Sequence, residues 1–243
     1  MDKPNRFQVD SFTLKIIAIL GMTADHIGNA YWDQLPLLGR CLLFTPGGLT
    51  FPIMAYLLTV GYRHTSDVRR YALRLGVFAL IALVPFWWVL GQHLNVLFTL
   101  LMGLVVIWAD DHLKNRVLFG VLFIAAILAS NWCDWQFIGV PMVFLYHRVQ
   151  NRYLKVLLPA LVVWAMGAYY VLQLTAMQAS FIAWLNFLPN LLYIFIGVTA
   201  TIPLLLAYNG QRGRPLKYFF YAYYPLHIAC LGLLRGILFG VWL

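Results

Sequence analysis

Residues 71–90 carry the sequence YALRLGVFALIALVPFWWVL, in which Arg74 is the one charged side chain. A helix of about twenty residues can cross a bilayer, because each residue adds about 1.5 Å and the hydrocarbon core is about 30 Å thick. A single basic residue near one end does not prevent this, since its long side chain can reach the headgroups. The stretch therefore predicts a membrane-spanning helix.

The composition of the whole chain also indicates a membrane protein. Of its 243 residues, 63% are hydrophobic and 10% are charged, and the mean hydropathy is +0.79. Soluble domains are about 45–50% apolar and about 25% charged. A water-soluble fold of this size could not bury so much apolar surface, so lipid has to cover it. The three cysteines show no spacing typical of a metal site, and no metal is expected.

Apolar segments bounded by charge, Pro or Gly recur along the chain and predict nine spans. They lie near 13–31, 46–62, 71–90, 94–109, 117–132, 135–146, 154–172, 188–207 and 216–241. The uncharged stretch 174–187 could add a tenth, partial helix. The predicted fold is an all-α, polytopic transmembrane helix bundle of about nine to ten spans, forming one integral-membrane domain over residues 1–243.

The basic residues predict the orientation of these spans. With nine spans and a cytoplasmic N-terminus, 15 of the 17 Lys and Arg residues fall on the inner side, which is the positive-inside pattern. Arg40 and Arg235 are the two on the outer side. The same distribution explains the net charge of +9 without nucleic acid, so no nucleic-acid partner is expected. The C-terminus is predicted to lie outside.

The first predicted span carries ionisable residues at bilayer depth, where they are costly and usually functional. Lys15 and His26 are eleven residues apart, close to three helical turns, so they share one helix face about 16 Å apart along the axis. Asp25 precedes His26 and needs a partner of its own, for which Arg40 and Arg235 are the candidates. The alternative is that Asp25 and His26 are a polar pair that only joins helices.

The last predicted span adds a second histidine. Pro225 interrupts the helix and His227 follows it at about mid-depth, where a packing role is the alternative. Tyr218 and Tyr221 lie near the inner end, and both could belong to an aromatic belt at the interface.

The loop after the second span is strongly basic. It brings together Arg63, Arg69, Arg70 and, one turn further on, Arg74. Arginine binds phosphate through two parallel charge-assisted hydrogen bonds, so the loop is a candidate for an anionic ligand. Alternatively, these residues only fix the orientation of the chain.

Several of these segments, in this order, resemble the TraX family, which is named for the conjugation protein that acetylates the N-terminal amine of F-type pilin. The resemblance runs from about residue 14 to 228. It rests on LKIIAILGMTADHIG (14–28), LGR (38–40), GYRHT (61–65), YALRL (71–75), LNVLFTL (94–100) and LKYFFYAYYPLHI (216–228). The chain is also distantly similar to integral-membrane sugar acyltransferases. Those enzymes have Arg where this chain has Lys15, with ten residues between it and the histidine.

This resemblance implies an acyltransferase of the bacterial inner membrane that uses cytosolic acetyl-CoA as donor. The acceptor is expected to be a pilin-like membrane peptide, with a cell-surface or periplasmic glycan as the alternative. A transporter or a non-catalytic assembly partner for pilin remains open from the residues alone. The expected catalytic residues are His26, Asp25, His227, Arg235 and Arg40, and the expected donor-binding residues are Lys15, Arg63, Arg69, Arg70, Arg74, Lys217 and Tyr221. His26 is expected to act as general base or to carry the acetyl group.

Overall fold

The computed structural model of the chain describes residues 8–91 and 94–240, and it confirms an all-α fold. Apart from two isolated backbone bridges, Val9 with Tyr208 and Leu94 with Cys133, these described residues form no strand. The helices are α1 (Ser11–Ala30), η1 (Trp32–Gln34), α2 (Leu37–Gly47), α3 (Thr50–His64), α4 (Val68–Leu90), α5 (Val96–His112), α6 (Arg116–Ser130), α7 (Gln136–Arg148), α8 (Arg152–Ala176), α9 (Phe181–Leu192), η2 (Tyr193–Gly197), α10 (Val198–Leu206) and α11 (Lys217–Phe239).

The chain forms two compact units, and the boundary between them falls inside α3. Unit 1 contains the residues up to Met54 together with Asn151–Lys217, and unit 2 contains Ala55–Gln150 together with the residues from Tyr218 onward. Each unit is described here by itself. The prediction of one domain stays a prediction.

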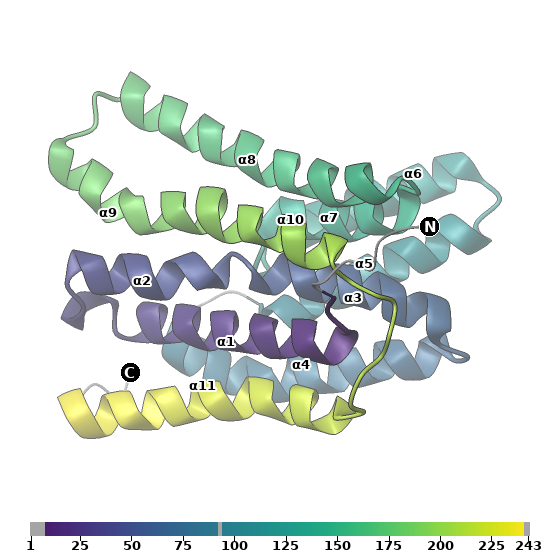
Figure 1. The fold of residues 1–243 in the computed structure, drawn as a ribbon, viewed down its shortest axis with the longest axis horizontal. Coiled ribbons are helices and arrows are strands. Elements are labelled where there is room, and N and C mark those ends of the chain that lie inside the picture. The colour runs from purple at the N-terminus through teal and green to yellow at the C-terminus, as the bar shows by residue number, and fades with distance from the viewer. Residues whose placement is uncertain (1–7, 92–93, 241–243) are drawn as a thin grey trace. The chain divides into compact units, whose positions relative to one another are not determined.

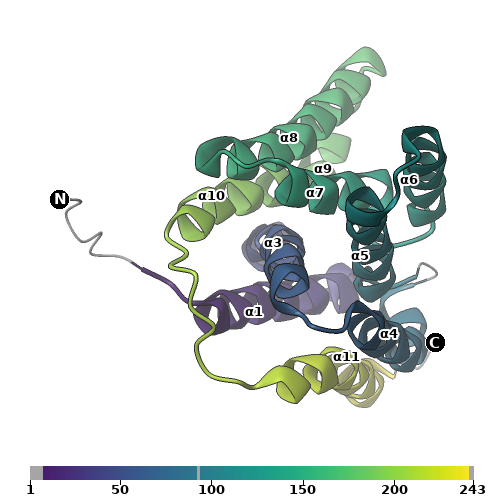
Figure 2. The ribbon, with the colours of Figure 1, turned by 90° about the vertical axis from the view of Figure 1, so that its right-hand side faces the viewer.

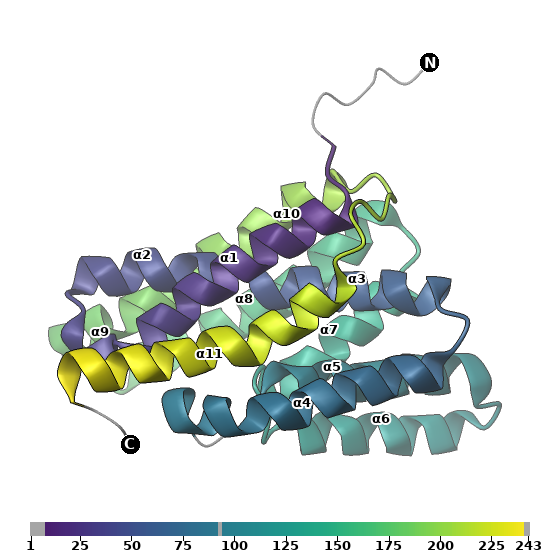
Figure 3. The same cartoon turned by 90° about the horizontal axis from the view of Figure 1, so that it is seen from below.

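In unit 1, α1 and α2 lie side by side and antiparallel (Figures 1 and 3). The other face of α2 packs on α9 and η2, and α8 folds back along η2 and α10. The start of α1 is held by Asp10, whose side chain accepts a 2.7 Å hydrogen bond from the backbone amide of Thr13. This bond lowers the pKa of the Asp10 carboxyl below its usual value. This cap fixes the residue at which α1 begins, and the packing on α2 fixes the direction of the helix.

In unit 2, α5 is the central helix and packs on α4, α6 and α7. α11 lies beside α4 (Figures 2 and 3). Phe78 stacks on Tyr221 at a centroid distance of 4.9 Å near one end of this pair of helices. Gly232 allows close approach near the other end, because a Cβ there would lie 2.6 Å from Val89.

Fewer helices are long and apolar enough to cross a membrane than the nine to ten expected from the sequence. Within residues 8–91 and 94–240, five segments qualify: Leu37–His64, Val68–Leu90, Arg152–Ala176, Phe181–Leu206 and Tyr218–Phe239. The sequence-based prediction counted every apolar stretch as a span, including stretches whose helices are too short to cross a bilayer. The α6 helix is apolar, but its 15 residues rise only about 22 Å, which is less than a hydrocarbon core of about 30 Å.

Two predicted spans begin earlier than expected. The segment predicted at 46–62 starts at Leu37, and the one predicted at 188–207 starts at Phe181. Both predictions took Pro and Gly as helix ends, whereas Pro46 and Pro189 lie inside helices α2 and α9. The suggested extra helix at 174–187 is wrong as well, because its first residues end α8 and its last residues begin α9.

Candidate functional site

The α1 helix presents the residues that the sequence singled out first. Lys15, Asp25 and His26 all lie within Ser11–Ala30, so the predicted helical spacing of Lys15 and His26 is present. His26 is buried, with 6% of its surface exposed, and Asp25 is half-buried. An ionisable pair on an apolar helix needs partners, and both residues interact with their surroundings.

Asp25 packs where the helix α2 breaks. A Cβ added at Gly47 would lie 2.6 Å from the Cβ of Asp25 and 2.8 Å from Cε2 of Tyr193. One helical turn before Asp25, a Cβ at Gly21 would lie 2.4 Å from the carbonyl oxygen of Pro46. Real Cβ atoms do not approach so closely, so α1 contacts this break only because both positions are glycine.

The π-helix η2 closes the same junction from the other side. A Cβ at Gly48 would lie 2.3 Å from the carbonyl oxygen of Tyr193, and a Cβ at Gly197 would lie 2.2 Å from that of Thr45. Irregular turns of this kind are frequent at functional sites, because they redirect side chains and free backbone groups from the helical pattern. Asp25, Gly47, Gly48, Tyr193 and Gly197 are called the glycine junction below.

Arg40 lies in the first turn of α2, and its side chain reaches back to the segment between α1 and α2. Its Nε donates to the carbonyl oxygens of Trp32 and Leu35, each at 3.0 Å, and its guanidinium lies 4.5 Å from the Trp32 ring centroid. These contacts give Arg40 a structural part in the turn. These contacts do not involve Asp25, so the expected role of Arg40 as counter-ion of Asp25 stays a prediction.

The predicted basic loop divides into residues with different surroundings. Arg74 lies 5.5 Å from the Tyr71 ring centroid and within hydrogen-bonding reach of Tyr221, and its Nε is buried without a hydrogen bond among the described residues. Arg70 instead pairs with Asp67 at 3.0 Å at the start of α4, and Arg69 is exposed. The loop therefore brings one predicted donor-binding pair together, Arg74 with Tyr221.

Arg63 and Lys217 complete the set of expected donor-binding residues. Arg63 donates to the carbonyl oxygen of His147 at 3.0 Å, so it caps the end of α7. The side chain of Lys217 lies outside the described part of the chain. Tyr218, the alternative interfacial residue, is exposed.

On α11, His227 is buried and Arg235 caps a neighbouring helix. Nδ1 of His227 lies 2.8 Å from the carbonyl oxygen of Tyr223, and the two rings stack. Arg235 donates to the carbonyl oxygens of Trp88 and Val89, at 3.2 and 3.3 Å, which end α4. A cation at a helix C-terminus is stabilised by the helix dipole.

The structure thus groups these predicted site residues, the catalytic ones and Lys15 of the donor-binding set, by unit. Lys15, Asp25, His26 and Arg40 belong to unit 1, and His227 and Arg235 belong to unit 2. The pairing of Asp25 with Arg235 stays a prediction. Sequence reasoning missed Gly47, Gly48, Tyr193 and Gly197, although the run Thr-Pro-Gly-Gly at 45–48 could have shown that an apolar helix breaks there.

The long apolar helices, with the buried His26 and the half-buried Asp25 beside a helix break, define a helical membrane protein. The TraX protein family matches residues 11–235, so the chain belongs to the TraX family. It is similar to the probable fimbrial assembly protein FimC, serogroup H1, of Dichelobacter nodosus, with 30% identity over 242 residues, 91% of this chain and 93% of that protein. No solved structure matches the chain.

Proposed function

We propose that this chain is an acetyltransferase of the bacterial inner membrane that acts on a pilin-like membrane peptide. The acetyl group would come from cytosolic acetyl-CoA and pass to the N-terminal amine of the peptide. Membership of the TraX family and similarity to a fimbrial assembly protein support a pilin-related role. The observation that carries the chemistry is the buried His26 next to Asp25 on α1, because ionisable groups at such positions in membrane proteins are costly and usually functional.

The proposed reaction is a direct acyl transfer. The peptide amine attacks the thioester carbon of acetyl-CoA, the carbon–sulfur bond breaks, and coenzyme A leaves as the thiolate. The neutral imidazole of His26 takes the proton that the amine loses and returns it to that thiolate. The glycine junction would hold the neighbouring Asp25 in place during this exchange, because the close contact at Gly47 limits its movement.

The donor would be held by the cluster of Arg74, Tyr71 and Tyr221. Arg74 is half-buried, its Nε has no hydrogen bond among the described residues, and arginine forks suit the phosphates of coenzyme A. Lys15 and the exposed Arg69 would add positive charge, which attracts an anionic donor from water.

Two other functions share part of this support. The same residues could acetylate a hydroxyl group of a cell-surface or periplasmic glycan, since only the acceptor differs. A role as an assembly partner without catalysis is favoured by one observation, the name of the relative as a fimbrial assembly protein.

Intact-mass analysis of small membrane peptides tests the proposal. Peptides from cells that make the protein should be heavier by one acetyl group than peptides from cells without it, and cells that make His26→Gln should resemble the latter. If lipid-linked glycans are acetylated and peptides are not, the acceptor is a glycan and the proposed peptide acceptor is wrong. If neither product is acetylated and pilus assembly still depends on the protein, the protein is an assembly partner without catalysis.

A further inference from the structure

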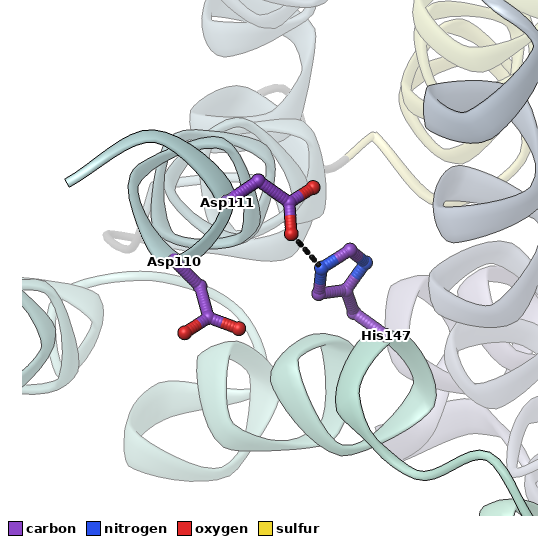
Figure 4. A group of neighbouring side chains, drawn as sticks. All are labelled: Asp110, Asp111 and His147. Atoms are coloured by element: carbon purple, nitrogen blue, oxygen red, sulfur yellow. Dashed lines mark hydrogen bonds and ion pairs between the residues drawn. The ribbon is translucent and has the colours of Figure 1, made fainter. Parts of the chain in front are cut away.

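We propose that unit 2 holds a divalent transition-metal ion between Asp110, Asp111 and His147, where the ends of α3, α5 and α7 meet. One donor atom from each of these side chains lies within 4.8 Å of the others. Figure 4 shows Asp111 pointing at the imidazole ring of His147, with Asp110 directed from the same end of α5 toward α7. Sequence reasoning did not find this group, because Asp111 and His147 are 36 positions apart.

The first argument is the position of the group on three helix ends. Asp110 and Asp111 lie in the last turn of α5, His147 lies in the last turn of α7, and Tyr62 of α3 donates a 2.8 Å hydrogen bond to Asp111. A helix C-terminus carries a partial negative charge, so three such ends and two carboxylates favour a cation. The bond from Arg63 to the carbonyl oxygen of His147 shows that one of these ends already attracts positive charge.

The second argument is a buried carboxylate oxygen that lacks a hydrogen bond. The side chain of Asp110 is only 5% exposed, and its Oδ2 has no hydrogen-bond partner among the described residues. Its other oxygen, Oδ1, lies 3.0 Å from Nη1 of Arg116, whereas Oδ2 lies 3.9 Å from Nη1 of Arg148, beyond hydrogen-bonding distance. A buried carboxylate oxygen without a donor is unfavourable unless a cation binds it.

The two arginines do not remove the need for a cation. The side chains of Arg116 and Arg148 are 62% and 65% exposed, so water screens most of their charge. Their ion pairs with Asp110 leave its Oδ2 without a hydrogen bond among the described residues. Asp111, which is half-open to water, provides a route by which an ion can enter.

The chemistry of the three side chains indicates the class of ion. An imidazole with two carboxylates suits Zn²⁺ or Mn²⁺ better than Mg²⁺ or Ca²⁺, which prefer oxygen ligands. Donor atoms that share one such ion at about 2.1 Å lie about 3–4 Å apart, so the group needs to close by only about 1 Å. Nε2 of His147, now 3.0 Å from Oδ1 of Asp111, would bind the ion once its proton is released to water or moved to Nδ1, and water would fill the remaining positions.

Metal analysis of the purified, tag-free full chain in detergent tests this site. After equilibrium dialysis against Zn²⁺ or Mn²⁺, the unaltered protein should retain about one ion per chain, and the ion should raise its unfolding temperature relative to protein in a chelator. Asp110→Asn, Asp111→Asn and His147→Gln should each weaken binding more than about 10-fold. His112→Gln is the matched control, because it makes the same change one residue beyond Asp111, where the exposed imidazole lies 2.8 Å from the carbonyl oxygen of Trp108 and stacks on the Trp108 ring.

Each result decides the proposal. No retained ion in the unaltered protein would overturn it and leave the arginines as the partners of the two carboxylates. Retention in the unaltered protein that persists in His147→Gln would overturn the assigned ligands. If a variant fails to fold, the metal content and chelator response of the unaltered protein, compared with His112→Gln, still give the answer.

Discussion

Asp25 lies directly against the α-carbon of Gly47, so closely that a methyl group at Gly47 would be 2.6 Å from the Cβ of Asp25. This contact joins the polar part of α1 to the break in the next helix. It also explains why the polar pair on α1 cannot be understood from α1 alone. The side chain proposed to support His26 is placed by a residue that has no side chain.

Gly47→Ala tests this contact. We expect the variant to lose about 1–3 kcal/mol of stability, because the added methyl group overlaps Asp25 and Tyr193 and the packed surroundings must shift. Thermal unfolding in detergent measures the loss. Gly120→Ala in α6 is the control, because nothing lies within 4 Å of the added methyl group, and it should be neutral or more stable by up to about 1 kcal/mol. Equal stability of the two variants would contradict the close packing at the glycine junction.

His26→Gln should lower acetyl transfer by about 100-fold or more at normal membrane levels. Glutamine keeps a similar polar volume but cannot accept a proton at neutral pH. The rate is measured by mass analysis of an acceptor peptide, and His112→Gln serves as the control for loss of an imidazole in general. Near-normal transfer by His26→Gln would make His227, which is also buried, the next candidate.

Arg74→Gln should weaken the apparent affinity for acetyl-CoA about 10-fold, whereas Arg69→Gln should change it little. The reason is that Arg74 is half-buried against Tyr71 with a free donor atom, while Arg69 is exposed and its interactions are screened by water. Steady-state kinetics with varied acetyl-CoA measure the difference. If the two variants behave alike, these arginines serve orientation only.

The number of crossings can be tested with three single cysteines in a chain without its own three. We expect Ser66→Cys and Gln211→Cys to be labelled from the cytoplasm and Gln178→Cys from outside, because the nine-span arrangement puts the basic loops inside. If only the five long apolar segments crossed, the residues at 66 and 178 would share one side and that at 211 would lie on the other. A membrane-impermeant maleimide distinguishes the two arrangements.

The cap of α1 predicts a small pH effect. The pKa of Asp10 is lowered in the folded protein, so its contribution is complete above the ordinary value of 3.8 and is lost as the pH falls through the lower folded value. Asp10→Ala should therefore cost about 1 kcal/mol at pH 7 and less at an acidic pH below the lowered pKa of Asp10. Asp10→Asn, which can cap without a charge, should remove the pH dependence. Unfolding of the three proteins at both pH values checks this, and an equal cost of Asp10→Ala at both would contradict it.

The sequence predicted the helical class because long apolar runs can form little else in lipid. It located α4, α8 and α11 within a few residues, since charged or polar residues mark their ends. It misplaced the starts of α2 and α9, because Pro46 and Pro189 interrupt the backbone bonding without ending the helix. Proline removes one donor, and the surrounding helices can make up for that loss.

The candidate site was predictable only where its members are close in sequence. Lys15, Asp25 and His26 share one helix, so their spacing was visible. The approach of Tyr193 and Gly197 to Gly48 was not, because contacts between distant segments leave no local pattern. The same holds for Arg235, whose role at the end of α4 depends on the register of two helices.

The polar residues of α1 also bear on how the chain enters the membrane. α1 is not among the five apolar segments, whereas Leu37–His64, whose first part packs along it, is one of them. Lys15, Asp25 and His26 make a lone helix partition weakly into lipid, so α1 gains a favourable place there only beside a more apolar neighbour. We therefore expect α1 to insert stably only after the second helix has been synthesised.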